Sequence, residues 1–427
     1  SGIQTWRRFT EQIGARIRKF LPNLLPDSNA ELSLPMPAMA FISILVPLLV
    51  VTIAVVVYMR TGRSSQYETY IAQAQVFREQ AMGETEPVRQ REVWSNVLQR
   101  VVQAETYNVT SATIAMRQEA QGRLDTLLGV TRLNYSPLFA SGIDAEISRM
   151  AASDSDLFML DATTGSILRG IIGRSYELDA TFDCKPGENG SNTVGSLVDL
   201  LALPKVNTLN SSVMGVDAMG NLLYCAPGQV SKAISLTPPT TNWGRVTAMA
   251  LDSGKLYVLD APARAVWIYT ETDGVFTDPP LFFFGNQIPD IEDAIDIAVN
   301  GDELYLLHAD GSLTYCMYSH LYGVPTRCDS PVTLLNRFPA YGGTDVFAQA
   351  HFTQMMLAAL PDATVILLDA DGQSLYRLSS RGFELQGILS AAVGNLPSGS
   401  LGAMTSGPNH VLYLVLGNQV YVTNNVP

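Results

Sequence analysis

A run of 28 residues without a charged side chain, residues 32–59, constrains this chain more than any other feature. As a helix, with a rise of about 1.5 Å per residue, its apolar centre at residues 39–58 is long enough to cross roughly 30 Å of hydrocarbon. The sequence therefore predicts a single transmembrane helix over residues 36–60. The membrane anchor would consist of the side chains of Met39, Phe41, Ile44, Leu48, Val51, Val55 and Tyr58.

Basic residues around this run predict its orientation. Five precede it, and only Arg60 and Arg63 follow it directly, so the bias favours a cytoplasmic N-terminus and an extracytoplasmic C-terminal part. Residues 1–35 are then a cytoplasmic basic juxtamembrane segment, in which residues 6–20 form an interfacial helix or a plain linker. A cleaved signal peptide is the alternative, but its apolar core is usually shorter, about 7–15 residues. The topology charges are Arg7, Arg8, Arg16, Arg18 and Lys19.

All four cysteines, Cys184, Cys225, Cys316 and Cys328, lie on the predicted extracytoplasmic side. Two disulfides fit this compartment. Cys316 and Cys328 are close in sequence across a turn-rich stretch, so they form one candidate pair, and Cys184 with Cys225 forms the other. Four unrelated buried thiols are the alternative. The part after residue 63 has a net charge of about −17, which argues against nucleic-acid binding.

Residues 64–130 have the apolar spacing of helices. Three stripes begin at Tyr67, Trp94 and Met116, and Gly129 is placed to end the last helix. The second and third stripes resemble one tetratricopeptide-type hairpin. A single hairpin cannot bury both of its faces, so we expect it to pack against the next domain or against another copy of the chain, as a structural stalk rather than a peptide-binding groove.

From residue 131 to residue 427 short β-branched and aromatic runs alternate with turn residues, which predicts a mainly β domain. A hydrophobic unit recurs with about 50 residues per copy, and this period favours a β-propeller ectodomain with six blades, although five or seven remain open. Residues 131–138 could supply the strand that closes the ring, beside residues 418–424. The six copies are residues 156–161, 221–225, 255–260, 303–308, 364–369 and 411–416.

The combination of a charge-poor anchor, a helical segment with Arg-Gln-Arg-Glu-Val-Trp-Ser-Asn-Val-Leu, and blades with Leu-Tyr-Leu-Leu-His-Ala-Asp-Gly-Ser-Leu resembles uncharacterised surface proteins of filamentous Chloroflexi-type bacteria. Some of those relatives are fused behind a cytoplasmic metal-dependent serine/threonine phosphatase of the PPM type. The resemblance implies a sensory or binding ectodomain. No phosphatase motif stands in this sequence, so no catalytic residue is carried over.

No motif of nucleophilic, metal or nucleotide chemistry is found. The four histidines have no partner at ligand spacing, and His308 takes the position where other copies have Asp161, Asp260 or Asp369. Acidic turns such as residues 369–372 and 290–296 are interpreted as hairpin turns rather than calcium loops. We therefore expect no catalytic residue, no metal site and no cofactor.

The favoured function is that of a membrane-anchored extracytoplasmic scaffold that binds proteins or an envelope polymer. Expected partners are the lipid bilayer, other envelope proteins or further copies of the chain, and no nucleic acid. A sensor ectodomain with a cytoplasmic signalling domain is the first alternative. A metal-dependent hydrolase or lactonase-like propeller is the second.

Overall fold

The structure is a computed structural model that describes residues 36–173, 176–190, 192–240, 243–321, 324–358, 364–424 and 426. The predicted cytoplasmic segment 1–35, with Arg7, Arg8, Arg16, Arg18 and Lys19, lies outside the described residues. The chain divides into two compact units. One is Ser1–Ala74 with Arg100–Ile114, and the other is Gln75–Gln99 with Ala115–Pro427.

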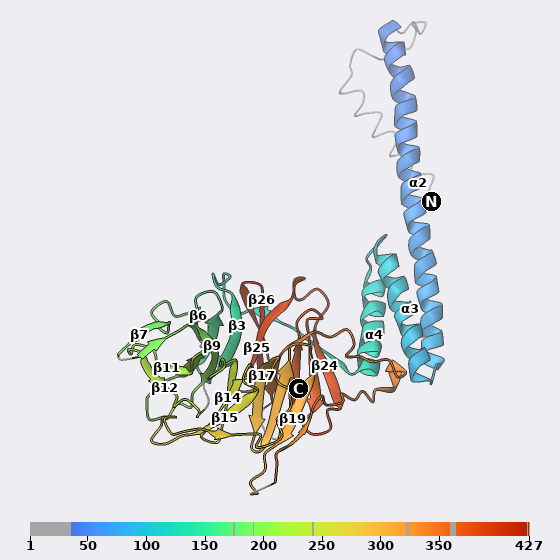
Figure 1. The fold of residues 1–427 in the computed structure, drawn as a ribbon. Coiled ribbons are helices and arrows are strands. Elements are labelled where there is room, and N and C mark those ends of the chain that lie inside the picture. The colour runs from blue at the N-terminus through green and yellow to red at the C-terminus, as the bar shows by residue number, and fades with distance from the viewer. Residues whose placement is uncertain are drawn as a thin grey trace. The chain divides into compact units, whose positions relative to one another are not determined.

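Three helices precede the β domain, namely α2 (Met36–Gly83), α3 (Pro87–Glu105) and α4 (Ser111–Leu128). Helix α2 runs without a break through residues 60–64, between the predicted span and the predicted helical segment (Figure 1). In the described part of the chain, no helix combines the length and the hydropathy that crossing a membrane requires. The transmembrane helix over residues 36–60 therefore stays a prediction.

Local capping explains where α3 and α4 begin and end. Pro87 opens α3, and the carboxylate of Glu86, rather than the hydroxyl of Thr85, accepts hydrogen bonds from two amides of the first turn at 3.1 and 2.9 Å. At the start of α4 the Thr110 hydroxyl accepts a hydrogen bond from the Thr113 amide at 3.2 Å. Gly129 ends α4 with a φ of 65°, a conformation that glycine adopts at little cost.

Six sheets follow, and we number them as blades in chain order. Blade 1 contains β3 (Ile147–Ala152), β4 (Asp156–Asp161), β5 (Ser166–Ile171) and β6 (Glu177–Leu178), and blade 2 contains β9 (Leu197–Ala202), β10 (Val213–Asp217), β11 (Asn221–Cys225) and β12 (Lys232–Ser235). Blade 3 contains β13 (Ala248–Asp252), β14 (Lys255–Asp260), β15 (Ala265–Thr270) and β16 (Leu281–Phe282), and blade 4 contains β17 (Ala294–Asn300), β18 (Glu303–His308), β19 (Leu313–Met317) and β20 (Arg327–Asp329).

Blades 5 and 6 also contain strands from the N-terminal side of the domain. Blade 5 is β21 (Phe352–Leu357), β22 (Thr364–Asp369), β23 (Ser374–Ser379) and β24 (Leu385–Ala391), with β1 (Val130–Leu133) parallel to β24. Blade 6 is β25 (Leu401–Gly407), β26 (Val411–Leu416) and β27 (Gln419–Thr423), completed by β2 (Ser136–Pro137) antiparallel to β27. Closure by residues 131–138 beside residues 418–424 is confirmed, whereas the pairing of β1 with blade 5 was not predicted.

The first strand of each blade lies on the inside of a closed ring. Contacts join β3 to β9, β9 to β13, β13 to β17, β17 to β21, β21 to β25 and β25 back to β3. In Figure 1, β3, β9, β17 and β25 stand near the middle of the β domain. A separate buried apolar cluster fills each of the six interfaces between neighbouring blades. The β domain is therefore a six-bladed propeller, as the repeat period predicted.

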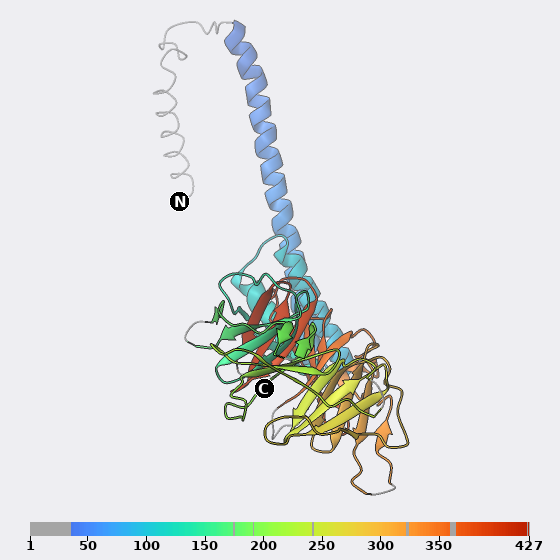
Figure 2. The ribbon, with the colours of Figure 1, turned by 60° about the vertical axis from the view of Figure 1, so that its left-hand side comes forward.

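Two short elements are inserted between blades. The hairpin of β7 (Gly187–Asn189) and β8 (Asn192–Val194) lies beside β11 and β12, and the 3₁₀ helix η1 (Pro339–Tyr341) lies between blades 4 and 5. The long turn between β19 and β20 extends from the sheets (Figure 2), as expected for a loop stapled by a disulfide.

One predicted repeat copy is wrong. Five copies form the second strand of their blades, but residues 221–225 form β11, the third strand of blade 2. The equivalent second strand is β10, Val213–Asp217. It contains Gly215, where a Cβ would lie 2.7 Å from the Leu197 side chain, so the leucine and tyrosine pattern of the other copies is absent there.

Candidate functional site

The last residue of each second strand ties the blade to the loop that precedes it. The carboxylate of Asp217 accepts hydrogen bonds from the amides of Gly195 and Met219 at 2.7 and 2.9 Å, and that of Asp260 accepts from Gly244 at 2.7 Å. His308 holds the same position in blade 4, as predicted. These buried turn residues are Asp161, Asp217, Asp260, His308 and Asp369, and blade 6 has Leu416 instead.

A second set of equivalent positions faces the centre of the ring. Each of these residues lies on the first strand of its blade. It is opposite the second-to-last residue of the second strand, or in the bulge beside that residue. A register shift accompanies it in five of the six blades. Such bulges re-aim side chains. The residues of this channel set are Arg149, Asp199, Ala248, Asp296, Gln354 and Ala403.

Acceptors of the channel set join neighbouring blades at three junctions. Asp199 of blade 2 accepts the Met249 amide of blade 3 at 2.7 Å, and Asp296 of blade 4 accepts the Met355 amide of blade 5 at 2.8 Å. Gln354 of blade 5 in turn accepts an amide of blade 6 at 2.7 Å. The side chains therefore satisfy backbone donors on the inner edges of the neighbouring first strands, where no further strand pairs with them.

Arg149 spans the channel. Blades 1 and 4 are opposite each other in a ring of six, and Nη1 of Arg149 lies 2.9 Å from Oδ2 of Asp296, while Nη2 donates to the Ile295 carbonyl at 2.8 Å. Burial disfavours the Arg149 cation, but the carboxylates of Asp296 and Asp199 outweigh this penalty and raise its pKa above the ordinary value. The ion pair between blades 1 and 4 is largely buried, since its partners are 15% and 7% exposed.

The channel set was not predicted from the sequence. A signal was present, because Arg149, Asp199, Asp296 and Gln354 are single polar residues inside apolar strands. Strict alternation would assign such residues to the solvent face, and only the bulge turns them toward the axis.

Burial raises the pKa of Asp199 from an ordinary 3.8 to about 6. The positive charge of Arg149 opposes this rise, and the negative charge of Asp296 adds to it. Folding then takes up a proton, so this contribution to stability is present below pH 3.8 and is lost as the pH rises through about 6. We expect the free energy of unfolding to be about 1 kcal/mol higher at pH 5 than at pH 7. Denaturant titrations at the two pH values measure this, with Asp199→Asn as the control that flattens the difference. An equal pH slope in the variant would contradict the assignment.

The predicted disulfides are confirmed. Cys184 bonds Cys225, and Cys316 bonds Cys328 across the paired strands β19 and β20. The Cys184 carbonyl accepts the Ile167 amide of blade 1 at 2.8 Å, so the first disulfide connects blades 1 and 2.

The predicted anchor residues all lie in α2, with Met39 near its start and Tyr58 farther along. The side chains of Phe41, Ile44, Leu48, Val51 and Val55 are between 47% and 68% exposed. Exposed apolar residues follow one another at nearly every position from Ile44 to Val56, so they cover all sides of the helix.

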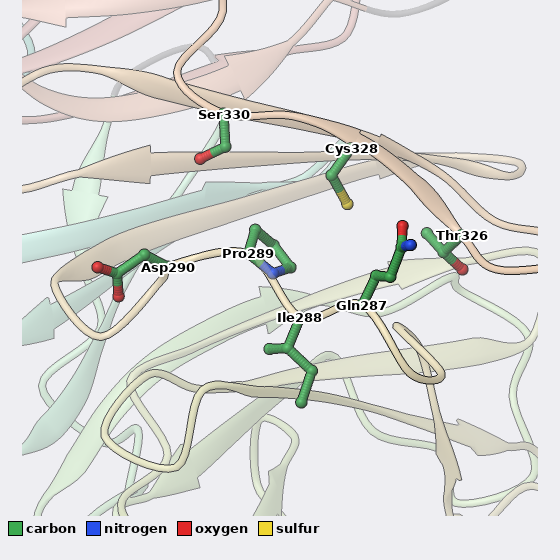
Figure 3. Close-up of a pocket in the computed structure, with 7 residues that line it drawn as sticks. All are labelled: Gln287, Ile288, Pro289, Asp290, Thr326, Cys328 and Ser330. Carbon is green, nitrogen blue, oxygen red and sulfur yellow. The ribbon is translucent and has the colours of Figure 1, made fainter.

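Two surface pockets lie in the loops of the propeller. One of about 530 Å³ lies between the turns of blades 1 and 6, where Leu416 replaces the turn carboxylate, and is lined by Asp144, Glu146 and Asn418 among others. The other, of about 290 Å³, lies at blade 4. Figure 3 shows Ser330 and Cys328 on one side of it, facing the segment with Ile288, Pro289 and Asp290.

Within the described ranges, no group of three His, Cys, Asp or Glu side chains is placed to hold a metal ion. The channel carboxylates of Asp199 and Asp296 are already bonded to backbone amides and Arg149.

No protein-family profile matches the sequence, and no curated protein matches it significantly. Solved structures with a similar fold include the WD40 β-propeller domain of Doa1, at 11% identity over 68% of this chain and 97% of that chain, with a TM-score of 0.40. The WD40 domain of Toxoplasma gondii coronin has 12% identity over 70% and 85% of the two chains and a TM-score of 0.41.

The gluconolactonase XC5397 from Xanthomonas campestris has 8% identity over 68% of this chain and 89% of that chain, with a TM-score of 0.47. At these identities and scores the similarities carry no functional argument. The assignment of a six-bladed propeller depends on the strand pairing and on the closed ring of inner strands.

Proposed function

We propose that this protein is a membrane-anchored extracytoplasmic scaffold, whose propeller binds proteins or an envelope polymer through its exposed loops. The observation that carries the proposal is the ion pair across the channel. Arg149 and Asp296 form an ion pair across the axis, and the acceptors of the channel set bind backbone amides. The proposed partner is therefore bound by the exposed loops at the rims of the propeller.

The anchor is proposed from α2. Its apolar side chains are exposed on all sides, and removing that surface from water is strongly favourable, since about 25 cal/mol are gained for each Å² buried. A bilayer is the partner that covers every side of a helix at once. The two disulfides support an oxidising compartment for the propeller.

Exposed apolar residues on the loops are the proposed contact points. Val206 and Val230 of blade 2 are 93% and 87% exposed, and Leu321 of the stapled turn in blade 4 is 70% exposed. A preformed hairpin loses little conformational freedom on binding, which favours affinity.

Site-specific photo-crosslinking in intact cells tests the scaffold function. A photoreactive residue at Val206 or Leu321 should give discrete crosslinked products, whereas one at the exposed Ser398, in the segment between blades 5 and 6, should give few. If all three positions gave the same low level of crosslinked products, the proposal that these loops bind a partner would be wrong.

A sensor ectodomain is the second candidate, and the junction between α4 and the propeller favours it. Arg132 of β1 bonds Asp125 of α4 at 2.9 Å, the Tyr341 hydroxyl donates to the Leu128 carbonyl at 3.3 Å, and the Phe338 ring packs on Gly129. A tightly packed connection can transmit a change that a flexible linker would absorb. Altered hydrogen exchange in α4 when a partner binds the propeller would favour sensing over scaffolding.

A further inference from the structure

Blade 4 contains a chain of hydrogen bonds that the scaffold function does not use. Nδ1 of His308 lies 2.7 Å from the Asp293 carboxylate, and Nε2 of His308 lies 2.8 Å from the Thr314 hydroxyl. The Thr314 hydroxyl lies 2.6 Å from that of Ser330. In blades 1, 2, 3 and 5 an aspartate at the His308 position bonds backbone amides directly, so the imidazole at the centre of the relay distinguishes blade 4.

Asp293, at one end of the chain of hydrogen bonds, determines which group donates in each bond. An ionised Asp293 can only accept, so Nδ1 of a neutral His308 donates to it and Nε2 is left as an acceptor. The Thr314 hydroxyl then donates to Nε2 and accepts from Ser330. Each donated proton on the path from Ser330 through Thr314 therefore points toward Nε2 of His308, so the Ser330 proton can be passed to His308 through Thr314.

The middle of the chain of hydrogen bonds is buried and its serine end is exposed, as a nucleophilic site requires. Thr314 is fully buried and the His308 side chain is 6% exposed, so water does not compete for the middle of the chain. Ser330 is exposed and lines the 290 Å³ pocket (Figure 3). The Cys316–Cys328 disulfide joins β19 to β20 and so fixes Ser330 beside Thr314.

We propose that Ser330 is a catalytic nucleophile toward small carboxylic esters, with Thr314, His308 and Asp293 as positioning residues. Oγ of Ser330 forms a bond to the acyl carbon while its proton passes to Thr314 and the Thr314 proton passes to Nε2 of His308. The resulting imidazolium is stabilised by Asp293. The leaving alkoxide takes a proton back through the same chain. Water then attacks the acyl carbon while its proton passes through Thr314 to His308, and the bond to Ser330 Oγ breaks as Oγ takes that proton back, which releases the carboxylic acid.

The pocket restricts the substrate class. Its volume suits a small acyl group, Ile288 and Pro289 supply apolar contacts, and the Asp290 carboxylate on its wall disfavours anionic esters. Neutral acetyl or propionyl esters fit these features.

Labelling of the full chain with a fluorophosphonate probe, followed by peptide mass spectrometry, tests the proposal, together with hydrolysis of p-nitrophenyl acetate. We expect labelling at Ser330, its loss in Ser330→Ala, and unchanged labelling in Ser398→Ala, which removes another exposed serine. Thr314→Val should slow labelling by about 10²-fold and Thr314→Ser should restore it. The wild-type rate should rise with pH through one ionisation that Thr314→Val abolishes.

Three results would overturn the proposal. The first is a Ser330 that is labelled no faster than Ser398 in the folded protein. The second is ester hydrolysis that persists in Ser330→Ala. The third is a folded Thr314→Val variant with the wild-type rate and pH profile. Circular dichroism of each variant confirms that the propeller is intact, and because Ser330 is exposed its alanine variant should fold.

Discussion

Replacing Arg149 with methionine is expected to lower the free energy of unfolding by about 3–5 kcal/mol, since removing one partner of a buried ion pair leaves an uncompensated charge. Here two carboxylates, Asp199 and Asp296, lose their cation in a buried channel. Denaturant titration at pH 7 measures the loss. Part of it should disappear at pH 5, because without Arg149 the pKa of Asp199 rises further and the group is neutral there.

A double variant separates the ion pair from general packing. Arg149→Met combined with Asp296→Asn removes both charges of the pair and should be less destabilised than Arg149→Met alone. A stability of Arg149→Met within about 1 kcal/mol of the wild type would contradict an energetically important bridge between blades 1 and 4.

The second large effect is expected from the disulfide between blades 1 and 2. Replacing Cys184 and Cys225 with alanine opens a loop of 41 residues, for which chain entropy gives a loss of about 4 kcal/mol. The pair Cys316 and Cys328 closes only 12 residues, and its removal should cost about 3 kcal/mol. Denaturation midpoints of the two double variants measure the losses.

The reduced wild-type protein is the control, because it should lose stability by an amount similar to the sum of the two variants. If neither double variant differed from the wild type under oxidising conditions, the disulfides would contribute nothing to the ring.

The repeat period favoured six blades over five or seven, because five second strands keep an apolar run that ends at a turn. The repeat copy of blade 2 was assigned to the wrong strand. Close packing at Gly215 of β10 requires a residue without a side chain, so the leucine and tyrosine pattern of the other second strands is absent there. Closure by β2 followed from the geometry of a ring, whereas the parallel pairing of β1 with β24 depends on the packing of Phe338 and Tyr341 around Gly129 and has no local signal.

The candidate sites were less predictable. The disulfide pairs could be inferred from spacing, but the channel set could not, since Arg149 and Asp296 are 147 positions apart and only the ring places them opposite each other. The relay to Ser330 likewise joins two loop residues, Asp293 and Ser330, with two strand residues of blade 4, His308 and Thr314. His308 was correctly placed at a strand end, but its partners are not at any recognisable spacing.

Extraction of the full chain from bacterial membranes with alkaline carbonate tests the proposed anchor, on which the scaffold account depends. The chain should stay in the membrane pellet, and a variant with Leu48→Lys, Val51→Lys and Val55→Lys should move to the supernatant, because charges at the centre of a span cost about 3 kcal/mol each. Lysines of the propeller should also react with an impermeant reagent added to intact spheroplasts. A wild-type chain that is released by carbonate, or a propeller that is labelled only after lysis, would contradict the account.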